Sequence, residues 1–276
     1  MLHDPRSAAG LLLVEIGNSH VTLAAAPRDR VEQPRRFERD TVDDFGPSAL
    51  SVWNDFPAGR RREIVIASVV PDDTVRFRNE LHDRLGAEPL VLGEHIPVSI
   101  HTNLAAPERI GIDRLCGAAA AYAEVQAACV VAGFGTATTI DCVSNEGVFV
   151  GGAILPGLAL QAWSLRQRTA QLPEITIETP EHVYGRNTLE AINNGIVYGA
   201  AGALREIVER YATDLGRWPR LVLTGGFAPL MRDICDFVDA LVPDLVLRGM
   251  ALSYRRFYAS EPPADSGEGF RSVTLN

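Results

Sequence analysis

Short apolar runs alternate with segments of helical spacing along most of this chain. Such runs predict strands, and apolar positions at helical spacing predict amphipathic helices. In the first part of the chain, strands are expected at residues 11–14, 21–25, 35–39, 64–70 and 90–92, and helices over 42–55 and 72–85. Asp72 or Asp73 is the candidate N-cap of the second helix. Alternating strands and helices of this kind predict an α/β lobe.

The second part of the chain repeats this order. After an apolar run at 98–100, an Ala-rich helix expected over 109–127 joins the two parts. Further strands are expected at 129–131, 139–143, 148–153 and 221–224, with helices from Gly157, over 187–211 and at the end. The repeat predicts one lobe over residues 10–118 and a second over 119–258. Residues 259–276, which contain Pro262-Pro263 and a Gly-rich stretch, are predicted to form a disordered tail.

A Gly-centred turn follows the first strand of each predicted lobe. The turns are Glu15-Ile16-Gly17-Asn18-Ser19 and Gly133-Phe134-Gly135-Thr136-Ala137-Thr138. Glycine lets the backbone approach a bound group closely, and the hydroxyls of Ser19, Thr136 and Thr138 suit phosphate oxygens. One such turn is more often an ordinary hairpin, because Gly and Asn are common hairpin residues. The pair favours a duplicated nucleotide-binding fold in which the turns face each other and hold a polyphosphate.

The composition narrows the classes of partner. The chain has 276 residues, 46% of them hydrophobic, which is enough to bury a large core in two lobes. Its net charge of −9 disfavours broad contact with nucleic acid or an anionic membrane. The N-terminal apolar run is interrupted by Glu15, so it is too short for a signal or membrane segment. We therefore expect a soluble protein that binds neither nucleic acid nor membrane.

The Cys and His residues do not indicate a metal centre. The four cysteines have no C-x-x-C spacing and lie in apolar segments, so buried reduced thiols in a cytosolic protein are expected. No H-x-x-x-H or H-E-x-x-H pair indicates zinc. The sequence thus predicts neither a disulfide framework nor a zinc site.

Three short motifs have both a structural and a functional interpretation. Asp113 either caps a helix, with Arg114 on the surface, or accepts a hydroxyl proton while Arg114 holds an anion. The Gly225-Gly226 pair follows a strand, where its backbone can approach a purine or phosphate closely. Asn187 or Thr188 opens the longest helix and either caps it or binds a ligand. Each motif alone is a weak signal.

Taken together and in order, these motifs resemble those of the type III pantothenate kinases. The resemblance covers roughly residues 11–258, with matching segments at 15–19, 68–71, 111–114, 135–141, 151–157, 169–173, 185–188 and 224–226. This family belongs to the superfamily of acetate and sugar kinases, actin and chaperone ATPases. The resemblance therefore implies an α/β fold of two duplicated ribonuclease-H-like or actin-like lobes, with mixed sheets and an interlobe nucleotide cleft.

The same resemblance implies an activity and its cofactors. The family uses ATP to phosphorylate pantothenate to 4'-phosphopantothenate, the first step of coenzyme A biosynthesis. Its members are similar in being cytoplasmic homodimers that need a divalent metal, Mg²⁺, and a monovalent cation, K⁺ or NH₄⁺. The expected partners of this chain are thus pantothenate, ATP and a second copy of itself.

Roles for individual residues follow from the resemblance by position. Asp113 would take or orient the pantothenate hydroxyl, and Glu15 would be the metal-linked carboxylate that phosphoryl transfer requires. The substrate pocket would be lined by Leu104, Gly111, Arg114 and Thr188, where a cationic side chain suits an anionic substrate. The phosphates would lie against Gly17, Asn18, Ser19, Gly135, Thr136 and Thr138, and the adenine near Gly225 and Gly226.

Three positions depart from the family pattern. Glu15 replaces the usual Asp and moves the carboxylate outward by one methylene, which matters because Mg²⁺ demands near-ideal geometry. Gly133 replaces an Asp associated with the monovalent cation, and Leu104 replaces an aromatic wall of the substrate pocket. Asp113 favours an active kinase with altered cation dependence. Gly133 favours a catalytically impaired homologue that acts as a ligand-binding or regulatory accessory protein, and a kinase for another small hydroxylated acid is the third hypothesis.

Overall fold

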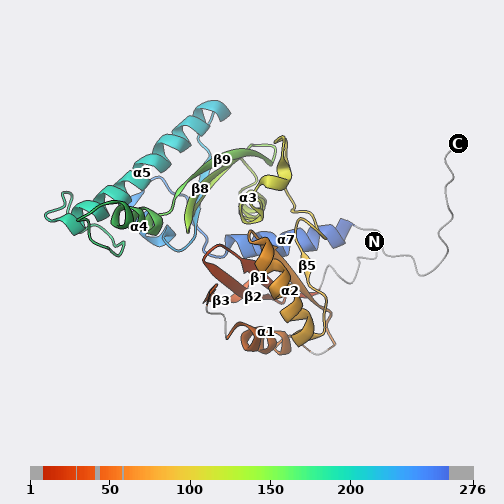
Figure 1. Ribbon diagram of the computed structural model, residues 1–276. Coiled ribbons are helices and arrows are strands. Elements are labelled where there is room, and N and C mark those ends of the chain that lie inside the picture. Colours follow the sequence, from red (N-terminus) through yellow and green to blue (C-terminus); the bar gives the residue numbers. More distant parts are fainter. Residues whose placement is uncertain (1–8, 29, 41–43, 58, 261–276) are drawn as a thin grey trace.

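Two mixed β-sheets with the same strand order form the framework of the molecule. The structure is a computed structural model that describes residues 9–28, 30–40, 44–57 and 59–260. The first sheet has the order β3-β2-β1-β4-β5, and the second has the order β11-β10-β7-β8-β9-β6 (Figure 1). When β7 to β11 are matched with β1 to β5, the two orders are the same, with β6 added at one edge. The duplication expected from the two Gly turns is therefore confirmed.

The first sheet begins with three antiparallel strands. β1 (Gly10–Ile16), β2 (His20–Ala26) and β3 (Glu32–Glu38) are antiparallel neighbours, and β4 (Arg62–Ser68) and β5 (Leu90–Val91) continue the sheet in parallel with β1. On one face Leu12 and Val14 pack with α1 (Phe45–Asn54) and α2 (Pro71–Leu85). Leu11 and Leu13 are buried on the other face. Because both faces are covered, β1 is an almost continuous apolar run.

The second sheet is built in the same way. β7 (Cys129–Phe134), β8 (Ala137–Val143) and β9 (Val148–Pro156) are antiparallel neighbours, and β10 (Arg220–Thr224) and β11 (Ala240–Leu241) continue the sheet in parallel with β7. The short β6 (His101–Thr102) pairs with β9. One face packs against α4 (Leu158–Arg168), α5 (Thr188–Leu215) and α6 (Ala228–Ile234), and the other packs against α3 (Ile112–Val125).

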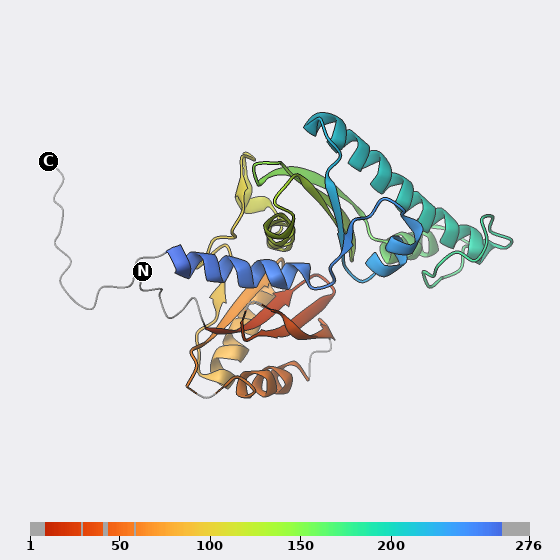
Figure 2. The same ribbon diagram turned by 180° about the vertical axis from the view of Figure 1, so that it is seen from behind.

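Helices α3 and α7 (Leu245–Ser260) lie between the two sheets (Figure 2). Cys116 of α3 is buried in one cluster with Met250 of α7 and Leu11 of β1. The last described helix thus completes the core of the first sheet, while α3 also packs against β7 of the second. These contacts fix how the sheets meet. The division of the chain into lobes at residue 118 stays a prediction.

Several helix ends differ from the sequence expectations. Helix α2 has Val70 as its N-cap because Pro71 already occupies the first helical turn, so neither Asp72 nor Asp73 caps it. The helix expected over 109–127 begins only at Ile112, since the preceding residues form a 3-10 helix, η2 (Pro107–Arg109). The apolar run at 98–100 is not a strand, and β6 follows it instead.

The end of the chain contains more structure than expected. In place of one last helix there are two, α6 and α7, separated by β11. Helix α7 extends to Ser260, so residues 259 and 260 are helical, and the rest of the predicted tail, 261–276, lies outside the described residues. No helix in the described part of the chain is long and apolar enough to cross a membrane. All four cysteines are buried free thiols, as expected.

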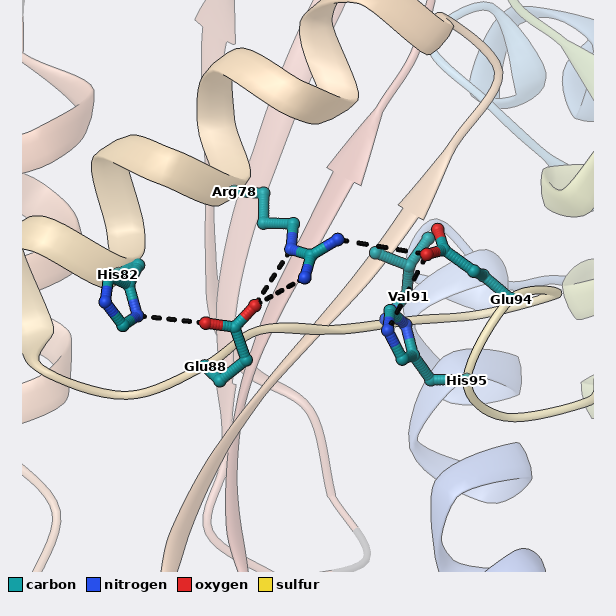
Figure 3. Close-up of polar contacts among 6 residues, drawn as sticks. All are labelled: Arg78, His82, Glu88, Val91, Glu94 and His95. Atoms are coloured by element: carbon teal, nitrogen blue, oxygen red, sulfur yellow. Dashed lines mark hydrogen bonds and ion pairs between the residues drawn. The ribbon is translucent and has the colours of Figure 1, made fainter.

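A surface network of ion pairs fastens α2 to the strand that follows it (Figure 3). Arg78 Nε and Nη2 donate to Glu88 Oε1 at 2.9 and 2.6 Å, and His82 Nδ1 lies 3.0 Å from Glu88 Oε2. The backbone N–H of Val91 in β5 donates to His95 Nδ1 at 3.0 Å. The hydrogen bond from Arg78 holds the pKa of Glu88 below its ordinary value. These contacts lie outside the cleft described below and serve the fold of the first sheet.

Candidate active site

A cleft of about 410 Å³ lies where the two Gly turns meet. Ser19 Oγ and Thr136 Oγ1, from opposite turns, are 2.8 Å apart and share a hydrogen bond. The expectation that the two turns face each other is therefore confirmed. Of the residues proposed from the sequence, the lining contains Glu15, Gly17, Asn18, Ser19, Asp113, Arg114, Gly133, Gly135, Thr136, Gly225 and Gly226.

Sheet register places equivalent rows of residues on the two walls of the cleft. In the first sheet Glu15 pairs with Thr22, and Thr22 pairs with Arg36. In the second sheet Gly133 pairs with Thr139 on one side and Thr224 on the other. All six residues line the cleft, because directly opposed residues point to the same face of a sheet. Glu15 and Gly133 each stand two residues before the Gly of their turn, so Gly133 is the counterpart of Glu15.

Thr138 is placed differently from the sequence expectation. Its side chain is buried, it does not line the cleft, and its Oγ1 has no hydrogen-bond partner among the described residues. Successive residues of a strand point to opposite faces, so Ala137, Thr139 and Asp141 face the cleft and Thr138 faces away. Thr139, and not Thr138, therefore faces the cleft.

Glu15 brings a destabilised carboxylate into the cleft. Burial raises its pKa from the ordinary 4.5 to about 7, the negative charge of Asp113 acts in the same direction, and the charge of Arg36 opposes both. Burial also raises the pKa of Asp113, although hydrogen bonds from backbone N–H groups, including that of Arg114, oppose this. Two carboxylates thus face one cleft with their charges poorly compensated. A bound cation would offset both the cost of burying the negative charge of Glu15 and the repulsion between Glu15 and Asp113.

Asp113 lies inside the first turn of α3 and is not its cap. The N-cap is Gly111, and Oδ1 of Asp113 accepts a hydrogen bond of 2.9 Å from the backbone N–H of Arg114. Gly111 itself does not line the cleft, but a Cβ at this position would lie 2.5 Å from Asp113 Oδ1. Glycine at position 111 therefore allows the carboxylate of Asp113 to take its observed position.

Arg114 is occupied by a partner from the second sheet. Its Nε donates to Asp141 Oδ1 and Oδ2 at 2.9 and 3.1 Å, and its Nη2 also donates to Oδ1. The Arg114 side chain is 15% exposed and that of Asp141 is 1% exposed. The interpretation of Arg114 as a surface residue beside a helix cap is therefore wrong. Its guanidinium joins α3 to β8 at the wall of the cleft.

Leu104 and Thr188 lie outside the cleft. Leu104 is an exposed residue between β6 and η2. Thr188 is the first residue of α5, which begins beside α4 and away from α3 in both views (Figures 1 and 2). The cap of α5 is Asn187, whose side chain accepts a 3.0 Å hydrogen bond from the N–H of Glu190. Substrate contacts by Leu104, Gly111 and Thr188 stay predictions.

Several lining residues were not anticipated from the sequence. They come from β2, from β3, from the segment before α7 and from the first turn of α7, and they are His20, Thr22, Pro34, Arg36, Pro243, Asp244, Val246 and Leu247. One sequence feature could have pointed to Arg36: the two-residue period of its strand, which puts Pro34 and Arg36 on the same face of the sheet. That period does not show which face meets the cleft, because only the pairing with Thr22 and Glu15 sets this.

Two duplicated mixed sheets with a cleft between their Gly turns define a two-lobed α/β protein of the actin-like kind. The family model of the type III pantothenate kinases matches residues 11–210. The type III pantothenate kinase of Rhodospirillum rubrum is 34% identical over 252 residues, which cover 89% of this chain and 98% of that protein. One from Dehalococcoides mccartyi is 38% identical over 192 residues, covering 70% and 74%. This chain belongs to the type III pantothenate kinase family.

A solved structure agrees with this fold. It is that of a conserved protein from Campylobacter jejuni named for the Baf family of transcriptional activators. The match has a TM-score of 0.58 and 19% sequence identity, and it covers 89% of this chain and 98% of that one. At this identity the likeness supports the fold alone.

Proposed function

We propose that this protein transfers the terminal phosphate of ATP to the primary hydroxyl of pantothenate, giving 4'-phosphopantothenate and ADP, the first step of coenzyme A biosynthesis. The family membership supports this reaction. The observation that carries it in the structure is the meeting of the two Gly turns over a cleft that also contains Asp113. This arrangement supplies phosphate-binding backbone and a base in one place.

Asp113 is the residue proposed to take the proton of the attacking hydroxyl. It lines the cleft, and burial moves its pKa upward, which brings a carboxylate closer to the operating pH at which a general base is most effective. Gly17, Asn18, Ser19, Gly135 and Thr136 are proposed to hold the phosphates through backbone N–H groups and hydroxyls, with Gly225 and Gly226 near the adenine. Positioning and charge neutralisation then supply most of the catalysis.

The donor set fits a divalent cation. Glu15 presents an oxygen ligand of the type Mg²⁺ prefers, and its raised pKa reports negative charge that the protein itself leaves poorly compensated. Glu15 would hold the metal, directly or through water. Mg²⁺ bound there would neutralise charge on the phosphates during transfer. No group of three or more His, Cys, Asp or Glu residues forms a ready-made metal site among the described residues, which suits a metal that is held largely by the nucleotide.

The monovalent-cation site is proposed to be weakened or lost. Gly133 carries no carboxylate, and a Cβ there would lie 2.9 Å from Thr139 Oγ1, so this hydroxyl occupies part of the space of a side chain. Asp141, another oxygen donor nearby in the cleft, is bound by Arg114. The described residues around Gly133 thus offer few uncommitted oxygen ligands for K⁺ or NH₄⁺.

A cytoplasmic homodimer is the assembly that we propose. Large apolar side chains are exposed on α4 and around the start of α5, including Trp163 at 56% and Tyr184 at 83% exposure. Exposed apolar side chains gathered on neighbouring elements are typical of protein interfaces. Sedimentation velocity on the wild type and on Tyr184→Asp tests this assembly, because a charge at the interface should shift the protein toward monomer.

A coupled assay of ADP release tests the proposed reaction. Wild-type protein is mixed with ATP, Mg²⁺ and pantothenate, and ADP should appear only when pantothenate is present, together with a phosphorylated product of the expected mass. A set of other small hydroxylated acids serves as the substrate control. ADP release with one of these acids and not with pantothenate would assign a different substrate. Nucleotide binding without any acid-dependent ADP release would refute the kinase assignment. The comparisons do not favour the accessory-protein hypothesis, since the relatives that they name are kinases.

A further inference from the structure

We propose that Arg36 binds the polyphosphate of the nucleotide from the third strand of the first sheet, and that His20 and Glu38 hold its guanidinium in place. This inference rests on the proposed function, since it assigns a further contact to the same nucleotide cleft. It concerns a residue that lies outside both Gly turns. The arguments for it come from sheet register, from the charges in the cleft and from the hydrogen bonds of His20.

Register brings Arg36 to the wall of the cleft. It occupies the same row as Glu15 and Thr22, and all three residues line the cleft. The Arg36 side chain extends across toward the second sheet, where its Nη1 lies 3.4 Å from the position a Cβ would take at Gly226. Arg36 therefore spans from the wall that carries Glu15 to the Gly225-Gly226 backbone. A nucleotide bound between the turns would therefore lie within reach of this side chain.

The charges in the cleft leave Arg36 as the cation available to a ligand. The two arginines in the described lining are Arg36 and Arg114, and Arg114 is held by Asp141 in a bidentate ion pair. Among the other carboxylates of the lining, Asp244 is bound by Arg248 at 2.9 Å. Glu15 and Asp113 then remain, together with the negative charge of the phosphates. Phosphoryl transfer requires cationic groups around the phosphates, and a guanidinium binds them with strong, charge-assisted hydrogen bonds.

Hydrogen bonds on the far side of the guanidinium fix its position. Arg36 Nη2 donates to His20 Nδ1 at 2.8 Å, so this ring nitrogen carries the lone pair. The proton is then assigned to Nε2, which donates to Glu38 Oε1 at 2.9 Å. His20 and Glu38 are directly opposed in β2 and β3, and Arg36 is the diagonal neighbour of His20 on the same face. His20 thus holds the guanidinium through a hydrogen bond to a ring nitrogen and not through an ion pair.

Nucleotide binding by Arg36→Met tests the proposal, with Arg35→Met as the matched control. Arg35 is the preceding residue of the strand, pairs with the buried Leu23 and does not line the cleft, so it lies on the opposite face of the strand. Arg35→Met therefore removes the same positive charge as Arg36→Met, but outside the cleft. The dissociation constants of AMP, ADP and a non-hydrolysable ATP analogue are measured by calorimetry without pantothenate. Arg36→Met should weaken binding of the analogue about 10- to 100-fold and leave AMP binding close to wild type. Arg35→Met should bind all three as the wild type does.

His20 is tested by a double-mutant cycle. His20→Phe should weaken binding of the ATP analogue less than Arg36→Met does, and it should have no further effect when Arg36 is already Met. Independent effects of the two changes would show that His20 does not act through Arg36. Thermal unfolding of every variant confirms that the proteins remain folded at the temperature of the titrations.

The outcomes separate this proposal from the kinase assignment. Wild-type affinity in Arg36→Met, an equal loss in Arg36→Met and Arg35→Met, or an equal loss for AMP and the ATP analogue would each overturn it. A wild-type protein that binds the ATP analogue and releases no ADP with pantothenate refutes the proposed function while Arg36 can still be tested. A wild-type protein that binds no nucleotide refutes both, and this result needs no substitution.

Discussion

Arg114, at the start of α3, and Asp141, in β8, form a bidentate ion pair that ties the helix at the cleft to the second sheet. Asp141 is 1% exposed, so burial raises its pKa although the hydrogen bonds from Arg114 oppose this. The guanidinium also lies over the ring of Phe149, 5.7 Å from its centroid. The pair thus places Asp113, the neighbour of Arg114, against the cleft wall through contacts that are distant in sequence.

Breaking this pair should destabilise the fold strongly. Asp141→Asn leaves the guanidinium of Arg114 without its counter-charge in a largely buried place, which should lower the free energy of unfolding by about 3 kcal/mol. Urea unfolding at pH 7 measures the change. The control is Asp236→Asn, which breaks an exposed pair with Arg205 and should cost less than about 1 kcal/mol. Equal effects in the two variants would mean that burial of the Arg114 pair is unimportant.

Asp113→Asn should separate catalysis from nucleotide binding. Asparagine keeps the size and hydrogen-bonding capacity of the side chain and removes the base, so kcat should fall about 100- to 10,000-fold. The dissociation constant of ATP should stay close to the wild-type value. Turnover is measured by pantothenate-dependent ADP release and binding by calorimetry. Wild-type turnover in Asp113→Asn would leave this residue only a structural role in the first turn of α3.

Gly111→Ala should lower turnover although Gly111 itself does not line the cleft. The new Cβ would lie 2.5 Å from Asp113 Oδ1, so the carboxylate must move away from its observed position. A displaced base should lower kcat by about 10-fold or more, because transfer depends on precise placement. The control is Gly202→Ala on α5, where a Cβ meets no atom within 4 Å. That change should leave kcat unaltered and stabilise the helix by roughly 0.5–1 kcal/mol. A wild-type kcat in Gly111→Ala would show that Asp113 tolerates the displacement.

The doubled Gly turns were readable in the sequence because their signals are local. Each consists of an apolar strand, a Gly and small hydroxyl residues in a short segment, and the structure brings Ser19 and Thr136 to 2.8 Å. The helix cap at Asn187 was among the expected alternatives for the same reason, since a cap depends on residues within one turn. The two mixed sheets also followed, because the alternation of strands and helices is typical of α/β lobes.

Long-range pairing carried the information that the sequence lacked. Asp141 as the partner of Arg114, and α7 on the first sheet, are contacts between segments far apart in the chain. The choice between Thr138 and Thr139 depends on which face of β8 meets the cleft, and a shift of one residue inverts it. The turn itself was therefore located correctly from the sequence, but the hydroxyl that faces the cleft belongs to the next residue, Thr139.

Potassium should have little effect on the rate of this enzyme. Gly133 offers no carboxylate, so ADP release measured with K⁺, with Na⁺ and with a bulky organic cation should be similar at equal ionic strength. Gly133→Asp adds an oxygen donor if the hydroxyl of Thr139 turns away to admit it, and this variant should gain stimulation by K⁺. Strong stimulation of the wild type by K⁺, with none by Na⁺, would mean that backbone carbonyls or other groups replace the missing carboxylate.

Glu15→Asp and Glu15→Ala should have opposite consequences for turnover. Aspartate keeps an oxygen ligand in the cleft, so kcat should be preserved or raised, whereas alanine removes the ligand and should abolish pantothenate-dependent ADP release. The Mg²⁺ concentration needed for half-maximal rate is measured for each variant that turns over. Robust activity in Glu15→Ala would show that the metal is held without this residue.

The raised pKa of Glu15 gives a pH-dependent penalty on stability. The folded-state pKa of about 7 exceeds the ordinary 4.5, so Glu15 contributes fully to stability below about pH 4.5 and loses this contribution as the pH rises through 7. Ionised Glu15 should then cost about 3 kcal/mol above that pH. Glutamine cannot ionise. Metal-free Glu15→Gln should therefore unfold at higher urea concentration than the wild type at pH 8 and at a similar concentration at pH 4.5, although it should have lost kinase activity.

The control for this pH dependence is Glu124→Gln, an exposed position on α3. Its effect on the free energy of unfolding should stay within about 0.5 kcal/mol at every pH. Comparing each variant with the wild type at the same pH removes the titration of groups that do not interact with residue 15, so the difference reports Glu15 and its coupling to Asp113. A Glu15→Gln effect that does not change between pH 4.5 and 8 would show that Glu15 titrates in the folded protein as it does in the unfolded chain. The carboxylate would then be well solvated in the cleft, and its charge would not be the reason the site favours a cation.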